Sequence, residues 1–282
     1  MLIFNRQVAL SAHLQSISRP PSSIGFVPTM GALHDGHLSL LKASVDANTV
    51  TVISIFVNPT QFNNPDDLAK YPRTLDADVE KIRTVSPEII VFAPDVHDIY
   101  EGNTTAKSFD FDGLENQMEG KFRPGHFDGV GTIVKRLFEI VTPDNAYFGE
   151  KDFQQLQIIK KMVSKLQMPV SVVGCPIFRE TNGLAMSSRN ERLTSEEKEA
   201  SSIIYSTLYT AKLLFGTENA DAVGQYVADV FKNNPTFELE YFTIADEETL
   251  EPVTQKSDDR KYRAFIAVFV NNIRLIDTIS LN

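Results

Sequence analysis

Short β-rich runs alternate with helical stretches between about residues 24 and 178, and this alternation constrains the fold more than any other feature. Strands are expected within 24–28, 48–59, 87–94, 145–153 and 168–178, and helices after residue 36, over 76–84 and 131–141, and around 156–166. Such alternation produces a parallel sheet with helices on both faces. We therefore predict an α/β fold, with an irregular stretch over 95–125 and a first helix within the N-terminal twenty residues.

The pattern changes after about residue 178. A helical segment capped by Thr194 or Ser195 follows, and the stretches 237–246 and 262–277 are typical of two strands of a smaller sheet. We predict two domains, a parallel α/β domain over 1–178 and a smaller α+β domain over 179–282. In open parallel sheets ligands bind at the carboxyl ends of the strands, and the polar clusters described below all follow expected strands.

The overall charge and the cysteine content limit the classes of function. The 282 residues carry a formal net charge of −10, which disfavours binding to nucleic acids. The single cysteine, Cys175, cannot form an internal disulfide, so we expect a cytoplasmic location. We expect no transmembrane helix, since no run of 18 apolar residues occurs, and no signal peptide.

The segment "VPTMGALHDGHLSLL" (27–41) places two of the five histidines, His34 and His37, where a strand passes through a loop into a helix. The N-terminus of a helix attracts anions, and Gly31 and Gly36 let a ligand approach the backbone closely. The pair could instead be a loop histidine with a helix cap. A metal site would need a third ligand, and no cysteine or further histidine is near in sequence.

"HDGH" matches the HxGH motif of a nucleotidyltransferase superfamily that binds ATP and forms adenylates. No GxxxxGK[ST] loop is present, and "GVGTIV" lacks the third glycine of a dinucleotide loop. The segments "PTMGALHDGHLSL", "IFVNPTQF", "DLAKYPRTLDAD", "RPGHFDGVGTIV", "YFGEKDFQQL" and "GLAMSSRNERLT" resemble, in order and spacing, the pantoate–β-alanine ligase family. The resemblance runs from about 24 to 194 and continues more weakly through "VFVNNIRLID".

This resemblance implies a Rossmann-like domain that binds ATP and pantoate, a smaller C-terminal α+β lid domain, and a homodimer formed through the N-terminal domain. It implies a cytoplasmic ligase of pantothenate biosynthesis. The substrates would be pantoate, β-alanine and ATP with Mg²⁺, and the products pantothenate, AMP and pyrophosphate, through a pantoyl adenylate. No nucleic acid or membrane partner is expected.

The resemblance also implies a set of site residues. The catalytic residues would be His34, His37 as proton donor, and Lys151. ATP would be bordered by Met30, Gly31, Ala32, Leu33, His34, Asp35, Gly36, His37, Gly149, Glu150, Lys151, Asp152, Phe178, Met186, Ser187, Ser188 and Arg189. Pantoate or β-alanine would contact Met30, Asn58, Gln61 and Gln155. The amide of a glutamine can both donate to and accept from a hydroxy acid.

Two further expectations rest on single positions. Arg123 and His126 would belong to a mobile lid that brings positive charge to the leaving pyrophosphate. Asp78 would be a Mg²⁺ ligand, although some relatives carry adjacent acids where this chain has Ala77 beside Asp78. The metal could therefore rest mainly on phosphate oxygens and water.

Two other functions remain open from the sequence. A different nucleotidyltransferase would need extra cations for a phosphate acceptor, where this chain offers Gln61 and Gln155. A catalytically inactive nucleotide-binding relative would be expected to lack some of the charged residues. All four are present here: His34, His37, Lys151 and Arg189.

Overall fold

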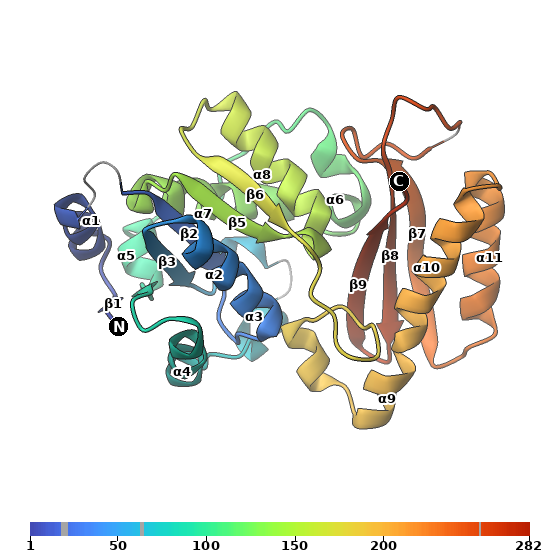
Figure 1. Cartoon of the computed structure of the whole chain (residues 1–282), viewed down its shortest axis with the longest axis horizontal. Coiled ribbons are helices and arrows are strands. Elements are labelled where there is room, and N and C mark those ends of the chain that lie inside the picture. Colours follow the sequence, from blue (N-terminus) through green and yellow to red (C-terminus); the bar gives the residue numbers. More distant parts are fainter. Residues whose placement is uncertain (18–21, 63–64, 254) are drawn as a thin grey trace. The chain divides into compact units, whose positions relative to one another are not determined.

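The computed structural model describes residues 1–17, 22–62, 65–253 and 255–282 (Figure 1). The chain forms two compact units. The first unit consists of residues 1–149 and 155–176, and the second of residues 150–154 and 177–282. The sequence predicted a division near residue 178, but it gave no sign that 150–154 would group with the C-terminal part.

The first unit contains a six-stranded parallel sheet. Its strands are β1 (Ile3–Phe4), β2 (Ile24–Thr29), β3 (Val50–Ile55), β4 (Ile90–Phe92), β5 (Asn145–Gly149) and β6 (Ser171–Cys175). The helices up to residue 165 are α1 (Gln7–Ile17), α2 (Asp35–Ala47), η1 (Pro59–Gln61), α3 (Pro65–Lys70), α4 (Leu75–Val85), α5 (Val96–Tyr100), η2 (Leu114–Asn116), α6 (Met118–Phe122), α7 (His126–Val141), η3 (Glu150–Asp152) and α8 (Phe153–Lys165). The predicted parallel α/β fold is confirmed.

The strand order is β1-β4-β3-β2-β5-β6, with every neighbouring pair parallel. From β2 the chain first adds β3 and β4 on one side and later adds β5 and β6 on the other. The order therefore reverses between β2 and β5, and in open α/β sheets ligands bind at the carboxyl ends of the strands beside such a switch point. His34 ends the loop after β2 and His37 lies in the first turn of α2, so the topology places both histidines beside this switch point.

Alternate residues of β2 point to opposite faces of this sheet, and helices lie on both sides of it (Figure 1). On one face Val27 is fully buried in a cluster with Leu41 of α2 and Ile82 of α4. On the other face the ring of Phe26 lies 6.2 Å from that of Phe138 of α7. The switch point is therefore supported by packed helices on both faces.

The second unit contains a three-stranded antiparallel sheet of order β7-β8-β9, formed by β7 (Phe237–Asp246), β8 (Tyr262–Val270) and β9 (Ile273–Ser280). Besides η3, which lies in this unit, its helices are η4 (Ser188–Arg192), α9 (Ser195–Ala200), α10 (Ser202–Phe215) and α11 (Ala220–Lys232). Apolar side chains of α10 and α11 form one core with the strands. Thr194 is the N-cap of α9, and it is one of the two cap residues predicted from the sequence.

Three details differ from the sequence predictions. The stretch 262–277 is not one strand, because Asn271, with φ of 51°, and Asn272 form the turn of a tight hairpin between β8 and β9. The stretch 95–125 is not wholly irregular, since it contains α5, η2 and α6. Strand β1 was not predicted. Among the described residues, no helix has the length and apolarity needed to cross a bilayer.

Candidate active site

The loop after β2 is held in a conformation that few side chains tolerate. Gly31 has φ of 83°, and a Cβ atom there would lie 3.0 Å from Ile55 Cγ2. Ala32 follows with φ of 50°, a left-handed conformation that costs free energy in a residue other than glycine. Such a conformation persists only when its surroundings fix it. The loop must therefore be supported from outside.

That support comes from α4. Asp78 is fully buried, and its two carboxylate oxygens accept the backbone N–H groups of Ala32 at 3.0 Å and Leu33 at 2.7 Å. Lys81, one helical turn further on, donates its ammonium to the Leu33 carbonyl at 2.6 Å. One helix face thus binds both the donors and the acceptor of the loop through charged groups, which make the stronger hydrogen bonds.

The two histidines lie together at the N-terminus of the 13-residue helix α2. His34 is the N-cap residue and His37 lies in the first turn, with ring centroids 4.0 Å apart. The His34 backbone N–H donates to Nδ1 of His37 at 3.3 Å. Since Nδ1 is the acceptor, we assign the proton of the neutral His37 ring to Nε2. His37 can therefore present an N–H donor to a ligand.

A second polar group surrounds the end of β3. The Asn58 amide nitrogen donates to Oε1 of Gln61 at 3.1 Å, and Nε2 of Gln61 lies 3.1 Å from the Met30 sulfur. Asn58 is itself buried, and its Oδ1 accepts from the Tyr100 hydroxyl at 2.5 Å. Burial raises the pKa of Tyr100, against the effect of its hydrogen bond with Thr60, so the phenol stays protonated and donates. The structure thus brings together three residues predicted to bind substrate, Met30, Asn58 and Gln61, with Asn58 buried behind the Gln61 side chain.

Helix α7 packs against this turn through a glycine. A Cβ atom at Gly129 would lie 2.2 Å from the backbone oxygen of Thr60 and 2.8 Å from the Cα of Gln61. The glycine in "GVGTIV" therefore serves close packing of a helix against the Gln61 turn. His126, the first residue of α7, is buried and has Nδ1 2.9 Å from the Gln61 backbone oxygen.

The sequence predicted that His126 belongs to a mobile lid, whereas in the structure its ring is buried. A buried ring hydrogen-bonded to the Gln61 turn is an anchor, and the structure supports that role for His126. Arg123, at the end of α6, lies 3.9 Å from the Glu119 carboxylate. Gln155, predicted to bind pantoate, lies half-exposed in the first turn of α8.

In the second unit, the turn η3 carries Lys151. Its side chain is 16% exposed, and its ammonium lies 3.6 Å from the Asp152 carboxylate. Burial raises the pKa of Asp277, whereas Arg179, which forms an ion pair with it at 2.6 Å, and more weakly Lys151 act in the opposite direction. Lys151 therefore lies in the electrostatic field of a buried carboxylate that Arg179 binds.

The residues of the predicted loop over ATP also lie in the second unit. Phe178 and Met186 face each other across a short hairpin, where the Met186 N–H donates to the Phe178 carbonyl at 3.0 Å. The Phe178 side chain is 42% exposed. Ser187 caps η4 by accepting the N–H of Arg189 at 3.3 Å, and residues 186–189 are half-exposed. The loop is thus ordered by its own hydrogen bonds and offers an apolar ring beside hydroxyl groups.

A family model described as pantoate-beta-alanine ligase matches residues 2–280. The chain belongs to the pantoate–β-alanine ligase family. It is 62% identical, over the whole of both chains, to the pantothenate synthetase of Flavobacterium psychrophilum. A solved pantothenate synthetase of Thermus thermophilus is 36% identical, with a TM-score of 0.91 over all of this chain and 99% of that chain.

Another solved structure is the pantoate–β-alanine ligase of Francisella tularensis complexed with beta-gamma ATP and β-alanine. It is 33% identical and has a TM-score of 0.80, covering all of this chain and 98% of that chain. The resemblance stated from the sequence motifs is therefore confirmed, as are the fold and the activity class of the pantoate–β-alanine ligase family.

The described residues of this pantoate–β-alanine ligase family member do not form a cage for Mg²⁺. Among the described residues, no group of three or more histidine, cysteine, aspartate or glutamate side chains is placed to hold a metal ion. Both oxygens of Asp78 accept backbone N–H groups, and the hydroxyl of Thr74 also donates to Oδ2 at 3.3 Å. In this structure the carboxylate of Asp78 holds the loop, and its role as a Mg²⁺ ligand stays a prediction.

Several supporting residues could not be found from the sequence. Lys81 and Tyr100 reach the site through contacts distant in sequence, and Asn190 holds the 178–189 hairpin by donating to Glu180 at 2.9 Å and to the Ala185 carbonyl at 3.1 Å. The only signal for Lys81 is its spacing of three residues from Asp78 on one helix face.

Proposed function

We propose that the chain joins pantoate to β-alanine at the cost of ATP. The pantoate carboxylate attacks the α-phosphorus of ATP and pyrophosphate leaves, which gives pantoyl adenylate. The amine of β-alanine then attacks the acyl carbon, loses a proton, and expels AMP. The observation that carries this proposal is the full-length 62% identity to a pantothenate synthetase, together with the histidine pair at the N-terminus of α2.

We assign the phosphates to the N-terminus of α2. The segment Met30–His37 borders ATP, with Gly31, Gly36 and the positive helix end next to the anion. His37 donates through Nε2 to a phosphate oxygen, because its Nδ1 is already occupied by the His34 N–H. Donors aimed in advance at developing charge are the largest single source of rate enhancement in such transfers.

Pantoate is assigned to the Gln61 turn and to Gln155. The contact of Asn58 with Oε1 leaves the amide nitrogen of Gln61 directed toward Met30, where a hydroxyl or carboxylate of the substrate could accept from it. Met30 supplies an apolar surface for the pantoate methyl groups. The burial of Asn58 supports a role in orienting Gln61 rather than in touching substrate.

We also assign to ATP Gly149, the last residue of β5, and, in the second unit, Glu150–Asp152, Phe178 and Met186–Arg189. Lys151 supplies an ammonium and Arg189 a guanidinium for phosphate oxygens, and the hydroxyls of Ser187 and Ser188 are further donors. Asp152 accepts from the ribose hydroxyls, and the exposed ring of Phe178 packs on the adenine. Mg²⁺ enters with ATP, held by phosphate oxygens and water.

We further propose that the protein is cytoplasmic and a homodimer through its first unit. The single cysteine, buried Cys175, supports the location. Three apolar side chains near the N-terminus, Leu2, Ile3 and Val8, are 48%, 49% and 77% exposed, which supports a contact surface there. Light scattering of the wild type and of Val8→Glu should give a dimer and a weakened dimer, respectively.

The deciding experiment is mass spectrometry of protein, Mg-ATP and pantoate labelled with ¹⁸O in its carboxylate, with and without β-alanine. Pantothenate and AMP should appear in equal amounts only with β-alanine, and AMP should carry one ¹⁸O, because the attacking oxygen stays on phosphorus. Unlabelled AMP would exclude the acyl-adenylate route. ATP binding without any product would show that the site binds nucleotide only.

A further inference from the structure

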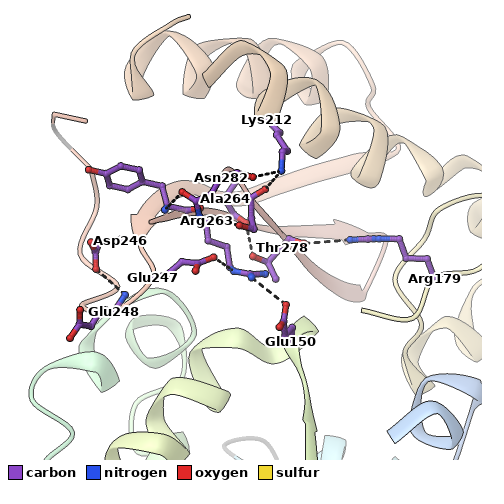
Figure 2. Close-up of polar contacts among 12 residues, drawn as sticks. Glu150, Arg179, Lys212, Asp246, Glu247, Glu248, Arg263, Ala264, Thr278 and Asn282 are labelled. Atoms are coloured by element: carbon purple, nitrogen blue, oxygen red, sulfur yellow. Dashed lines mark hydrogen bonds and ion pairs between the residues drawn. The ribbon is translucent and has the colours of Figure 1, made fainter. Parts of the chain in front are cut away.

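The start of β8 carries a buried cation. Arg263 is 7% exposed, on a strand whose residues are almost all buried. A buried charge is costly unless it is paired and hydrogen-bonded. Its Nε donates to Glu247 at 2.9 Å and its Nη2 to Glu150 at 3.3 Å (Figure 2). Its guanidinium also lies 4.0 Å from the centre of the Phe153 ring.

Two of these three partners lie on either side of Lys151. Glu150 immediately precedes it and Phe153 follows it by two residues, so Arg263 contacts both ends of the three-residue turn η3. The Phe153 ring is fixed in turn by Phe265 of β8, at 6.0 Å between ring centres. The turn is therefore held against one rigid strand, and the backbone that carries the Lys151 side chain is fixed with it.

Besides fixing the turn, Arg263 compensates the negative charge of Glu150 next to Lys151. Two carboxylates that could compete for the Lys151 ammonium are each bound by an arginine, Glu150 by Arg263 and Asp277 by Arg179. The ammonium of Lys151 lies 3.6 Å from the half-exposed Asp152 carboxylate. Without Arg263, an unpaired Glu150 carboxylate would stand next to Lys151, where it would attract the ammonium and repel a polyphosphate.

We propose that Arg263 is a positioning residue for Lys151: it fixes the η3 turn and neutralises Glu150, so that the Lys151 ammonium is directed at the ATP phosphates. This rests on the role proposed above for Lys151. Arg263 itself touches no substrate and acts only through the turn.

The variants are Arg263→Met and Arg263→Lys. Methionine removes the charge and the forked contact, and kcat/KM for ATP should fall roughly 10- to 100-fold, since misplacing a reacting group by about 1 Å can cost that much. Lysine keeps the buried charge, and thus the fold, but cannot reach both carboxylates and stack on Phe153, so its loss should be intermediate. KM for β-alanine should not change in either variant.

Arg274→Met is the matched control. Arg274 of β9, whose side chain is 21% exposed, forms an ion pair with Glu240 of β7 at 2.5 Å. It lies at the other end of the same sheet, where it is paired in register with Phe269. This variant should lower the melting temperature and leave kcat/KM for ATP unchanged. A parallel loss of activity in Arg274→Met would make Arg263 a general stabiliser and overturn the proposal.

The closing experiment combines these variants with Lys151→Met in single-turnover formation of the adenylate. If Arg263 acts through Lys151, then Arg263→Lys or Arg263→Met adds less than about twofold to the loss in Lys151→Met, because residues that act as one unit are not additive. A full additional loss would overturn the proposal. Normal turnover by Lys151→Met alone would instead refute the role proposed for Lys151.

Discussion

Replacing Asp78 by asparagine tests the loop of the histidine pair most directly. The two side chains have nearly the same shape, but the amide has one oxygen where the carboxylate has two. Each oxygen of Asp78 accepts one backbone N–H, from Ala32 and from Leu33. Whichever way the amide is turned, its NH₂ group meets a donor, and one buried N–H loses its acceptor.

The cost can be estimated from these contacts. An unsatisfied buried N–H costs about 1–3 kcal/mol, and the remaining hydrogen bond weakens by about 1 kcal/mol when its acceptor loses its charge. The free energy of unfolding should therefore fall by about 2–4 kcal/mol, which corresponds to a decrease in melting temperature of roughly 4–16 °C. The strained φ of Ala32 would lose its support, so kcat/KM for ATP should fall as well.

Asp76→Asn is the matched control, since Asp76 is exposed in the same first turn of α4. It removes the same charge near the helix N-terminus, where the expected cost is about 0.3–1 kcal/mol. Both variants are compared by thermal denaturation and by activity over a Mg²⁺ titration. If Asp78→Asn melts like Asp76→Asn, or if excess Mg²⁺ restores its activity, Asp78 is a metal ligand and the loop reasoning is refuted.

Three other substitutions give distinct outcomes. His37→Ala should slow adenylate formation roughly 100-fold with little change in melting temperature, and a normal single-turnover rate would remove His37 from the mechanism. Gly129→Ala places a Cβ atom 2.8 Å from the Gln61 Cα, so it should lower the melting temperature and raise KM for pantoate, whereas Gly224→Ala, with open space around it, should do neither. Gln155→Ala should raise KM for pantoate in steady-state assays, and a change confined to β-alanine would reassign it.

The parallel sheet could be predicted because five of its six strands have a local sequence pattern. The β-branched run of β3 and the apolar stripe of α7 are readable within a dozen residues. Strand β1 could not, since it has two residues and exists only through pairing with β4 nearly ninety positions away (Ile3 with Val91). The break between β8 and β9 was missed because Asn271-Asn272 is a weaker turn signal than Asn-Gly.

The candidate site divides in the same way between near and distant contacts. The groups assigned to ligands, such as His37 and Lys151, follow strand ends within recognisable motifs. The groups that hold them are separated from them by long stretches of chain: Asp78 is 45 residues from Leu33, and Arg263 is 113 residues from Glu150. From sequence alone, an aspartate near a phosphate site is interpreted as a metal ligand. A buried arginine on a strand belongs to no sequence pattern that would indicate its role.

The role of Asp78 as a Mg²⁺ ligand stays a prediction, and its contacts favour a role in holding the loop. A carboxylate can bind Mg²⁺ only with a lone pair directed at the ion, whereas both oxygens of Asp78 accept backbone N–H groups of the loop. Moving Asp78 to a metal would leave those donors buried and release the strained Ala32. The loop geometry that presents His34 and His37 therefore depends on Asp78 staying where it is.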